Sequence, residues 1–307
     1  MGKLLTPRNI AWTLGILAVM VLSAVLFPVP LPTISLPAEK VIEVGKPGGF
    51  FLSNTLITTF LADIVLVALA IAGTRSLKLI PSGLQNVLEW IIEGFYNLVD
   101  DVAGRENAKR WFPLIMTIML FVLVANWWEL VPGVDSIGLL THPHEEGMTA
   151  YKARQLGPIG LLTRHEVKDP HEGYVLVPFM RTATTDLNLP LALALISVFW
   201  TQVQGFRALG LGYLKRFFNF SGFLEAIVGF LELVSELAKI ISFSFRLFGN
   251  IFAGTILLFV IPYLIPFFVP LPFYGLEVFV GFMQAFVFAM LTLVFMTIAV
   301  VGHGHEH

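Results

Sequence analysis

Long apolar stretches, separated by short polar segments, dominate the pattern of positions along this chain. A helix needs about 20 apolar residues to cross the hydrocarbon core of a bilayer. Six stretches reach that length, at about residues 9–28, 51–73, 112–131, 187–208, 221–261 and 273–301. Because lipid offers the backbone no hydrogen-bonding partner, the pattern predicts an all-α, polytopic membrane protein.

The amino-terminal stretch has the pattern of a membrane anchor. Lys3 and Arg8 precede an apolar run longer than the usual core of a signal peptide, and no A-x-A cleavage motif follows it. A cleaved signal peptide is the alternative. We expect residues 1–50 to form an uncleaved anchor helix and an outer linker, and residues 51–307 to form the membrane domain, with an outer loop at 132–182.

A polar interruption between the second and third spans also has helical periodicity. Its apolar residues, from Leu84 to Val102, share one stripe, and Ser82 with Gln85 matches a capping box at the start. We expect an amphipathic helix that lies in the membrane interface. A surface helix packed within a cytoplasmic loop fits the same pattern.

Composition narrows the classes of function. Hydrophobic residues make up 56% of the chain and charged residues 13%, whereas soluble domains have about 45–50% and about 25%, so a water-soluble enzyme is excluded. The absence of cysteine excludes disulfides and thiolate metal sites, and a net charge of -2 does not fit a nucleic-acid-binding protein. We expect neither a cofactor nor a functional metal site, because the histidines of the outer loop and tail are loosely spaced.

Basic residues set the expected orientation, because lysine and arginine concentrate in cytoplasmic loops. If the spans alternate, the bases before the first span and those within 75–78, 105–110 and 207–216 fall on one side, which should be the cytoplasm. The 132–182 loop would then lie outside, although it also carries lysine and arginine.

The stretch at 221–261, which we expect to end before Pro262, is too long to stand upright in a membrane. As one helix it would measure about 60 Å, twice the roughly 30 Å of the hydrocarbon core, so it must kink or slant steeply. Its charged and amide residues fall along one line of the helix surface. They are Glu232, Glu236, Lys239, Arg246 and Asn250.

Arg246 is the most demanding residue of this polar stripe. An arginine at mid-membrane costs about 3 kcal/mol or more, and it cannot escape by losing its proton. Glu236 and Lys239 can neutralise each other on the helix, whereas Arg246 has no acid within one turn. Its partner must therefore come from another helix or another protein. Pairing inside the fold, to hold helices together, is the structural alternative.

Other polar residues are expected to gather on either side of Arg246. The outer group comprises Glu129, Asp186, Asn188, Asn250, Glu277 and Thr255, and the inner group comprises Glu232, Ser235, Glu236 and Lys239. An interface anchor is the alternative for Glu129, and a helix N-cap for Asp186. Gln284, on the same helical face as Glu277, is a candidate neutral neighbour of Arg246. Two polar regions separated by a fixed charge form no continuous pore, so transport would need a group that shuttles between them.

Short motifs in these stretches resemble the subunit a family of F-type ATP synthases. The run SFRLFGN at 244–250, continued by IFAG, resembles the family signature, and MQAFVF at 283–288 resembles its last helix. Segments 126–132 and 183–188 resemble shorter family motifs. The likeness extends over about residues 50–300.

The resemblance implies a stator subunit with two offset proton half-channels that load and unload carboxylates on a ring of c subunits. Arg246 matches the essential arginine of the family, and Gln284 matches its partner on the final helix. The outer half-channel is matched by Asn250, Glu277, Glu129, Asp186 and Asn188, and the inner one by Glu232 and Ser235. The paired slanted helices of the family would form a hairpin facing the rotor.

The resemblance also implies partners and a location. The c-subunit ring, the b subunits of the peripheral stalk and the remaining F1Fo subunits would surround the chain in the bilayer of the cell inner (plasma) membrane. The chain would be non-catalytic by itself, and would couple proton flow to rotation and ATP synthesis.

The chain departs from the family pattern at two positions. Many members carry an ionisable residue where Thr255 stands, and Glu236 is an additional acid on the inner stripe. Asp63, a lone acid in the second span, receives no assignment. The main rival is a stand-alone secondary transporter that binds an anionic substrate at Arg246. A purely structural membrane scaffold is a third possibility.

Overall fold

The computed structural model describes most of the chain from residue 37 onward. The described ranges are 37–44, 50–75, 77–131, 133–142, 150–156, 159–167, 173–218, 222–265 and 268–301, with the isolated positions 15, 18 and 22. Except for those three positions, the expected anchor at about 9–28 lies outside the described residues. The division at residue 50 therefore stays a prediction.

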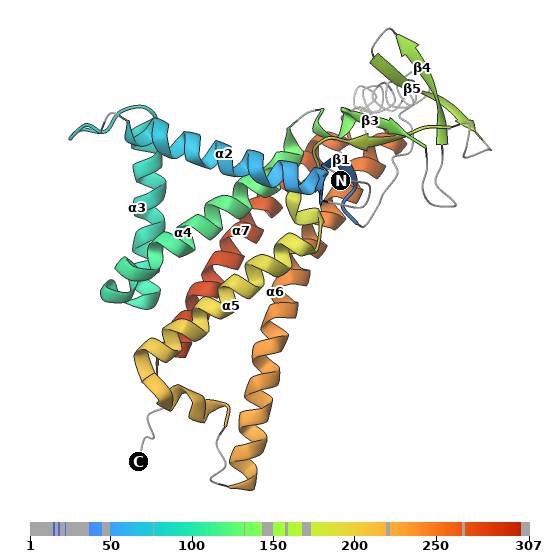
Figure 1. The fold of residues 1–307 in the computed structure, drawn as a ribbon. Coiled ribbons are helices and arrows are strands. Elements are labelled where there is room, and N and C mark those ends of the chain that lie inside the picture. The colour runs from blue at the N-terminus through green and yellow to red at the C-terminus, as the bar shows by residue number, and fades with distance from the viewer. Residues whose placement is uncertain are drawn as a thin grey trace, which may run out of the picture. The chain divides into compact units, whose positions relative to one another are not determined.

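Helices make up most of the described chain (Figure 1). They are α2 (Asn54–Thr74), α3 (Leu84–Ala103), α4 (Arg105–Trp127), α5 (Asn188–Leu209), α6 (Phe223–Leu264) and α7 (Pro270–Val300). Within the described residues, all of these except α3 are long and apolar enough to cross a membrane. The all-α, polytopic fold class is confirmed.

Two helix boundaries differ from expectation. The third span begins earlier, because α4 starts at Arg105 and contains Pro113. The prediction that Pro262 ends the long helix is wrong, since α6 continues to Leu264. Ile265 N–H donates to the Ile261 carbonyl at 2.8 Å across the proline. A proline this close to the end removes only its own hydrogen bond, so the last turn persists.

The predicted capping box at the start of α3 is wrong. The N-cap is Gly83, with φ of 62° and no side-chain cap. The Gln85 side chain instead pairs with the backbone of Lys78, accepting from its N–H at 3.1 Å and donating to its carbonyl at 3.0 Å. Gln85 therefore holds the preceding turn, which leaves Ser82 no capping role.

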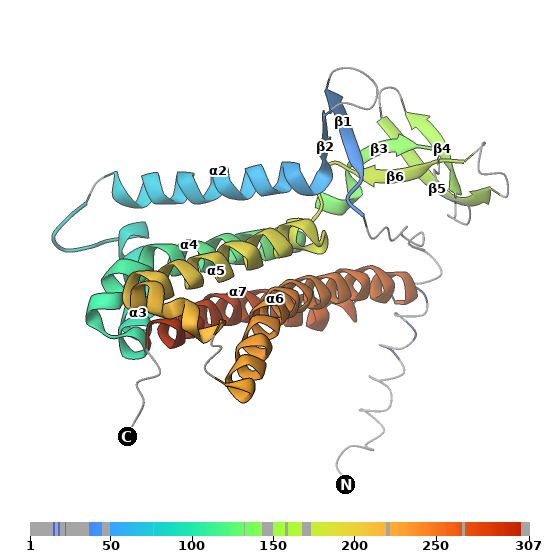
Figure 2. The same cartoon turned by 60° about the horizontal axis from the view of Figure 1, so that its bottom comes forward.

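The chain divides into two compact units, each built from separate sequence segments. The first comprises Met1–Ile57, Glu129–Arg181 and Phe252–Val280, and the second comprises Thr58–Trp128, Thr182–Ile251 and Gly281–His307. The helices α4, α5 and α7 run alongside one another within the second unit in both views (Figure 2). The division line crosses α6 and α7, so each of them contributes to both units.

The first unit contains three two-stranded antiparallel sheets that the apolar pattern does not predict. The pairs are β1 (Lys40–Val44) with β2 (Phe50–Ser53), β3 (Gly138–Thr141) with β6 (Val175–Pro178), and β4 (Ala150–Leu156) with β5 (Ile159–Val167). Burial alternates along β6 with the period of two that a half-covered strand requires. The expected outer loop is therefore folded over its described parts.

The core of the second unit forms where α3, α4 and α7 meet. Phe95 and Val99 from α3 pack with Trp111 and Ile115 from α4, and Leu293 lies in the same cluster. Gly104, with φ of 76°, both ends α3 and starts α4, a conformation that glycine adopts without strain. One face of α3 therefore packs against α4 and α7, and its place in the membrane interface stays a prediction.

Candidate functional site

Arg246 lies on an exposed face of α6. Its Nη2 donates to the Ser242 hydroxyl, one turn earlier, at 3.4 Å. Within the described part of the chain, no carboxylate forms an ion pair with its guanidinium. The alternative in which Arg246 is paired inside the fold therefore gains no support from these residues.

An aromatic contact fixes how α6 passes α7 near Arg246. Phe243 packs against Phe288 and Phe295, with ring centroids 5.1 and 5.4 Å apart. The two helices run in opposite directions, so Arg246, after Phe243, and Gln284, before Phe288, lie to the same side of this contact. No hydrogen bond within 3.5 Å joins the two side chains among the described residues, so the prediction that Gln284 neighbours Arg246 stays a prediction.

The first unit brings three of the predicted outer residues together. Glu129, Thr255 and Glu277 are 6, 6 and 5% exposed. Thr255 and Glu277 both act on the Glu129 carboxyl, although its oxygens accept no hydrogen bond within 3.5 Å. Gly254 allows this approach, because a Cβ at that position would collide with the Glu277 carboxylate. Three elements distant in sequence, η1 (Trp128–Leu130), α6 and α7, thus contribute to one acidic cluster.

Sequence reasoning missed two charged residues beside this acidic cluster. Asp135, in η2 (Val134–Ser136), and the buried Arg181 both lie near enough to influence Glu129. Burial raises the pKa of Asp135 from 3.8 to about 6, while Arg181 opposes that rise. Their position in a loop of mixed charge offered no sequence signal, because the signal is proximity in the folded unit.

Asp186 and Asn188 form a local pair at the start of α5. The Asp186 carboxylate accepts the Asn188 N–H at 3.2 Å and the Asn188 side-chain amide at 3.0 Å. These contacts tie the Asp186 carboxylate to the first residue of α5, one position before the N-cap residue Leu187. Asn250 lies on the exposed side of α6. These three residues belong to the second unit, whereas Glu129 and Glu277 belong to the first, so a shared outer group stays a prediction.

Asn126, in the motif at 126–132, has a structural role that sequence reasoning did not assign. The buried Asn126 side chain donates to the Gly281 carbonyl at 3.1 Å and accepts from the Thr184 hydroxyl at 2.8 Å. It thereby ties α4 to α7 and to η3 (Ala183–Thr185) within the second unit. The two short motifs at 126–132 and 183–188 thus meet in space.

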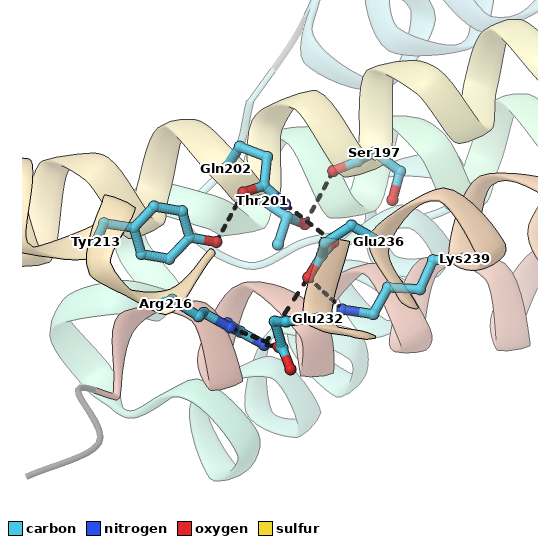
Figure 3. Close-up of polar contacts among 8 residues, drawn as sticks. All are labelled: Ser197, Thr201, Gln202, Tyr213, Arg216, Glu232, Glu236 and Lys239. Atoms are coloured by element: carbon cyan, nitrogen blue, oxygen red, sulfur yellow. Dashed lines mark hydrogen bonds and ion pairs between the residues drawn. The ribbon is translucent and has the colours of Figure 1, made fainter. Parts of the chain in front are cut away.

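Three of the predicted inner residues gather in one partly buried polar cluster of the second unit (Figure 3). Lys239 Nζ lies 2.7 Å from Glu236 Oε1, so the expected pairing along the helix is present. Glu232 pairs with Arg216, which ends η4 (Gly210–Arg216) after α5. Ser235 is exposed and does not join this cluster.

Arg216, Gln202 and Tyr213 complete this inner cluster, and sequence reasoning did not find them. Gln202 donates to Glu236 Oε2 at 2.9 Å, and the Tyr213 hydroxyl donates to Gln202 at 2.8 Å. The sequence pattern indicates a role for Arg216 only as one of the basic residues that set the orientation. A signal was available, since two acids four residues apart on an intramembrane stripe need two cations, and Lys239 is only one.

Two other groups of residues gain no role. Asp63 is exposed on α2, and none of the described residues forms a hydrogen bond or ion pair with it. His142, in the outer loop, bonds to the Gly173 carbonyl at 3.0 Å. Among the described positions, no group of three His, Cys, Asp or Glu side chains could hold a metal ion.

Comparisons with known proteins agree on one family. A sequence profile described as ATP synthase A chain matches residues 55–297. ATP synthase subunit a of Moorella thermoacetica is 31% identical over 265 residues, covering 86% of this chain and 97% of that protein. The same subunit of Gloeobacter violaceus is 31% identical over 277 residues, covering 88% and 96%. In Campylobacter jejuni it is 32% identical over 250 residues, covering 80% and 89%.

The extent of these matches confirms the resemblance carried by the motifs at 244–250 and 283–288. The profile covers most of the chain and all five candidate spans. Of these spans, it omits only the first residue of α2 and the last three residues of α7. The chain therefore belongs to the ATP synthase subunit a family and is a multi-pass membrane subunit of the Fo part of that complex.

Proposed function

We propose that this chain is the stator subunit of the Fo motor and forms two offset proton half-channels. These half-channels load and unload the carboxylates of the c-subunit ring, and so couple proton flow to rotation and ATP synthesis. The chain performs no catalysis by itself. Its partners are the c ring, the b subunits of the peripheral stalk and the remaining F1Fo subunits, in the cell inner membrane.

The observation that carries this proposal is the environment of Arg246. The side chain is exposed on an apolar helix and, among the described residues, lacks a carboxylate partner. An unpaired arginine in a membrane is costly, so a carboxylate from another protein is the expected neighbour. At about 4 Å and an effective dielectric near 20, such a pair gains about 4 kcal/mol.

This pairing makes the rotor carboxylate change its protonation state as it passes. Beside Arg246 it is ionised, and facing lipid it is protonated, because a bare charge in hydrocarbon is too costly. The acidic cluster of Glu129, Thr255 and Glu277 supplies protons from one side. The cluster of Glu232, Glu236 and Lys239 exchanges them on the other, with Gln284 beside Arg246 as a neutral donor. Asn250, Ser235, Asp186 and Asn188 belong to these paths only by resemblance.

Replacing Arg246 tests the proposal. In inverted membrane vesicles that hold the whole complex, Arg246→Ala should abolish ATP synthesis driven by a proton gradient. Arg75→Ala, which removes another exposed arginine at the end of α2, should leave synthesis near the unmodified rate. Robust synthesis by Arg246→Ala would overturn the proposal, and tolerance of Arg246→Gln would point to a scaffold.

A further inference from the structure

The two acids of the inner cluster have different environments. Glu236 is 7% exposed, and donors occupy both of its oxygens. Oε1 accepts from Lys239 at 2.7 Å, and Oε2 accepts from Gln202 at 2.9 Å. A carboxylate held in this way has little room to accept a proton, because each oxygen already faces an N–H group.

Glu232 has one oxygen engaged and one open. Arg216 Nε lies 2.6 Å from Glu232 Oε1, and Arg216 Nη2 contacts the same oxygen. None of the described donors contacts Oε2, and the side chain is 29% exposed. Glu232 is therefore the acid of this cluster that can take up and release a proton while its charged form stays paired.

Charge balance links the two acids. Arg216 Nη2 also lies 3.8 Å from Glu236 Oε1, so one guanidinium serves both carboxylates. Two cations, Arg216 and Lys239, face two anions, and the cluster is neutral when all four are ionised. Without Arg216, two carboxylates four residues apart on one helix would share a single cation, an unfavourable arrangement.

The position of Arg216 depends on Tyr213, which lies in the same element, η4. The buried Tyr213 ring packs against Phe206 and Phe217, with centroids 5.0 and 5.6 Å away. A side chain at Gly205 would collide with this ring. With its hydroxyl bonded to Gln202, Tyr213 holds η4 against α5, and Arg216 at the end of η4 reaches the acids of α6 (Figure 3).

We propose that Arg216 is a positioning residue of the inner half-channel. It pairs with Glu232 Oε1 and leaves Oε2 open as the proton acceptor, while Glu236, with both oxygens held by Lys239 and Gln202, acts as a fixed counter-charge. A proton exchanged with the rotor binds at Glu232 Oε2 and leaves to water on the predicted cytoplasmic side. This inference rests on the proposed function, because it assigns roles within one of its half-channels.

Two double variants of equal charge test this assignment in vesicles that hold the whole complex. Arg216→Gln should lower ATP-driven proton pumping by about tenfold or more, because one opposite charge near an acid changes its proton binding by that order. Adding Glu236→Gln restores neutrality and keeps the acceptor, so pumping should largely recover. Adding Glu232→Gln restores neutrality but removes the acceptor, so pumping should stay low.

Controls separate positioning from folding. Lys215→Gln removes an exposed cation from the same element and should leave pumping unchanged. Arg216→Lys keeps the charge without the two-nitrogen contact and should retain more pumping than Arg216→Gln. The amount of chain in each purified complex normalises every rate, so a variant that assembles poorly is still comparable.

Several outcomes would overturn the inference. They are normal pumping by Arg216→Gln, equal recovery by both double variants, or recovery by neither when the complex is intact. Arg246→Ala, measured in parallel, tests the proposed function itself. If Arg246→Ala stops pumping while the two double variants behave alike, the inference fails and the proposed function stands.

Discussion

Individual polar residues acquire their chemistry from neighbours that are distant in sequence. Many family members carry an ionisable group at the position of Thr255, which cannot ionise. Thr255 nevertheless lies in one cluster with two acids, Glu129 and Glu277. We infer that these two acids together provide the proton-binding capacity of the outer group. Both are buried, and among the described residues no cation forms an ion pair with them, which suits them to exchange protons.

The space at Gly254 gives a first prediction at this scale. Gly254→Ala should reduce ATP-driven pumping by about tenfold, since overpacking costs about 1–3 kcal/mol and the new methyl group displaces the Glu277 carboxylate. Gly275→Ala, on α7 where an added Cβ meets nothing within 4 Å, should pump normally. Fluorescence quenching in inverted vesicles measures both rates. Equal rates would contradict the role given to this contact.

Asp135 gives a second residue-scale prediction, based on pH. Its pKa of about 6 lies above the ordinary 3.8 because it is buried, so it stays neutral up to nearly pH 6 and ionises above that. Between these values the folded chain binds more protons than the unfolded chain, and Asp135 therefore lowers stability as pH rises. Arg181, Glu129 and Tyr274 are the titratable groups that act with it.

Infrared difference spectra of the complex can detect this carboxyl group. The band of the protonated Asp135 carboxyl group is identified as the one that the Asp135→Asn variant lacks. In the unmodified complex, this band should disappear as pH rises, with a midpoint near pH 6. Asp101→Asn, which changes an exposed aspartate on α3, should leave that band unchanged. A midpoint near 3.8 would show that burial does not act on Asp135 as inferred.

Helices and strands show where local pattern is sufficient. The long helix α6 and its polar stripe follow from periodicity alone, because spacing around a helix depends only on sequence distance. The start of α3 does not, since Gln85 bonds to the backbone of Lys78 rather than closing a capping box. The β3–β6 pair also escaped prediction, because it joins strands from opposite ends of the outer loop, and so did the local hairpin β4–β5.

The packing of α3 gives an element-scale prediction. Phe95 is 6% exposed in the core of the second unit, whereas Trp90 on the same helix is 75% exposed. Phe95→Ala should destabilise this unit by about 3–5 kcal/mol, and Trp90→Ala by less than about 0.5 kcal/mol. Retention of the chain in complexes heated in detergent measures the difference. A larger effect of Trp90→Ala would favour a helix held mainly by the membrane interface.

At the scale of the whole molecule, the polar stripe of α6 divides into two parts. Glu232, Glu236 and Lys239 find partners within the chain, while Arg246 remains exposed without a carboxylate among the described residues. Under the proposed function, transport uses a mobile carboxylate from outside the chain. The stand-alone transporter accounts less well for this division, because it requires a closed binding site around Arg246.

The isolated chain gives a prediction at this scale. Reconstituted alone in liposomes, it should show neither uptake of anionic substrates nor coupled proton flow, because the shuttling carboxylate is absent. Liposomes containing the whole complex, at the same amount of chain, should pump protons when ATP is supplied. Arginine-dependent anion uptake by the chain alone would favour the rival transporter.

Sequence was sufficient for the membrane class, for five of the six expected spans and for the stripe that carries Arg246. These properties depend on composition and on spacing along one helix, which are local. Family membership followed from motifs that are contiguous in the chain. The positions of individual caps and helix ends were less accessible, because competing hydrogen bonds such as that of Gln85 settle them.

Apart from the Glu236–Lys239 pair, which helix spacing predicts, only folding settled which acids have cations beside them. Arg216 and Glu232 are 16 residues apart, and Gln202 and Glu236 are 34 apart, so their meeting depends on how η4 turns back beside α6. Glu129 and Glu277 likewise meet only within the folded first unit. Proton binding depends on charges and burial within a few ångströms, and no periodicity in a linear sequence encodes those distances.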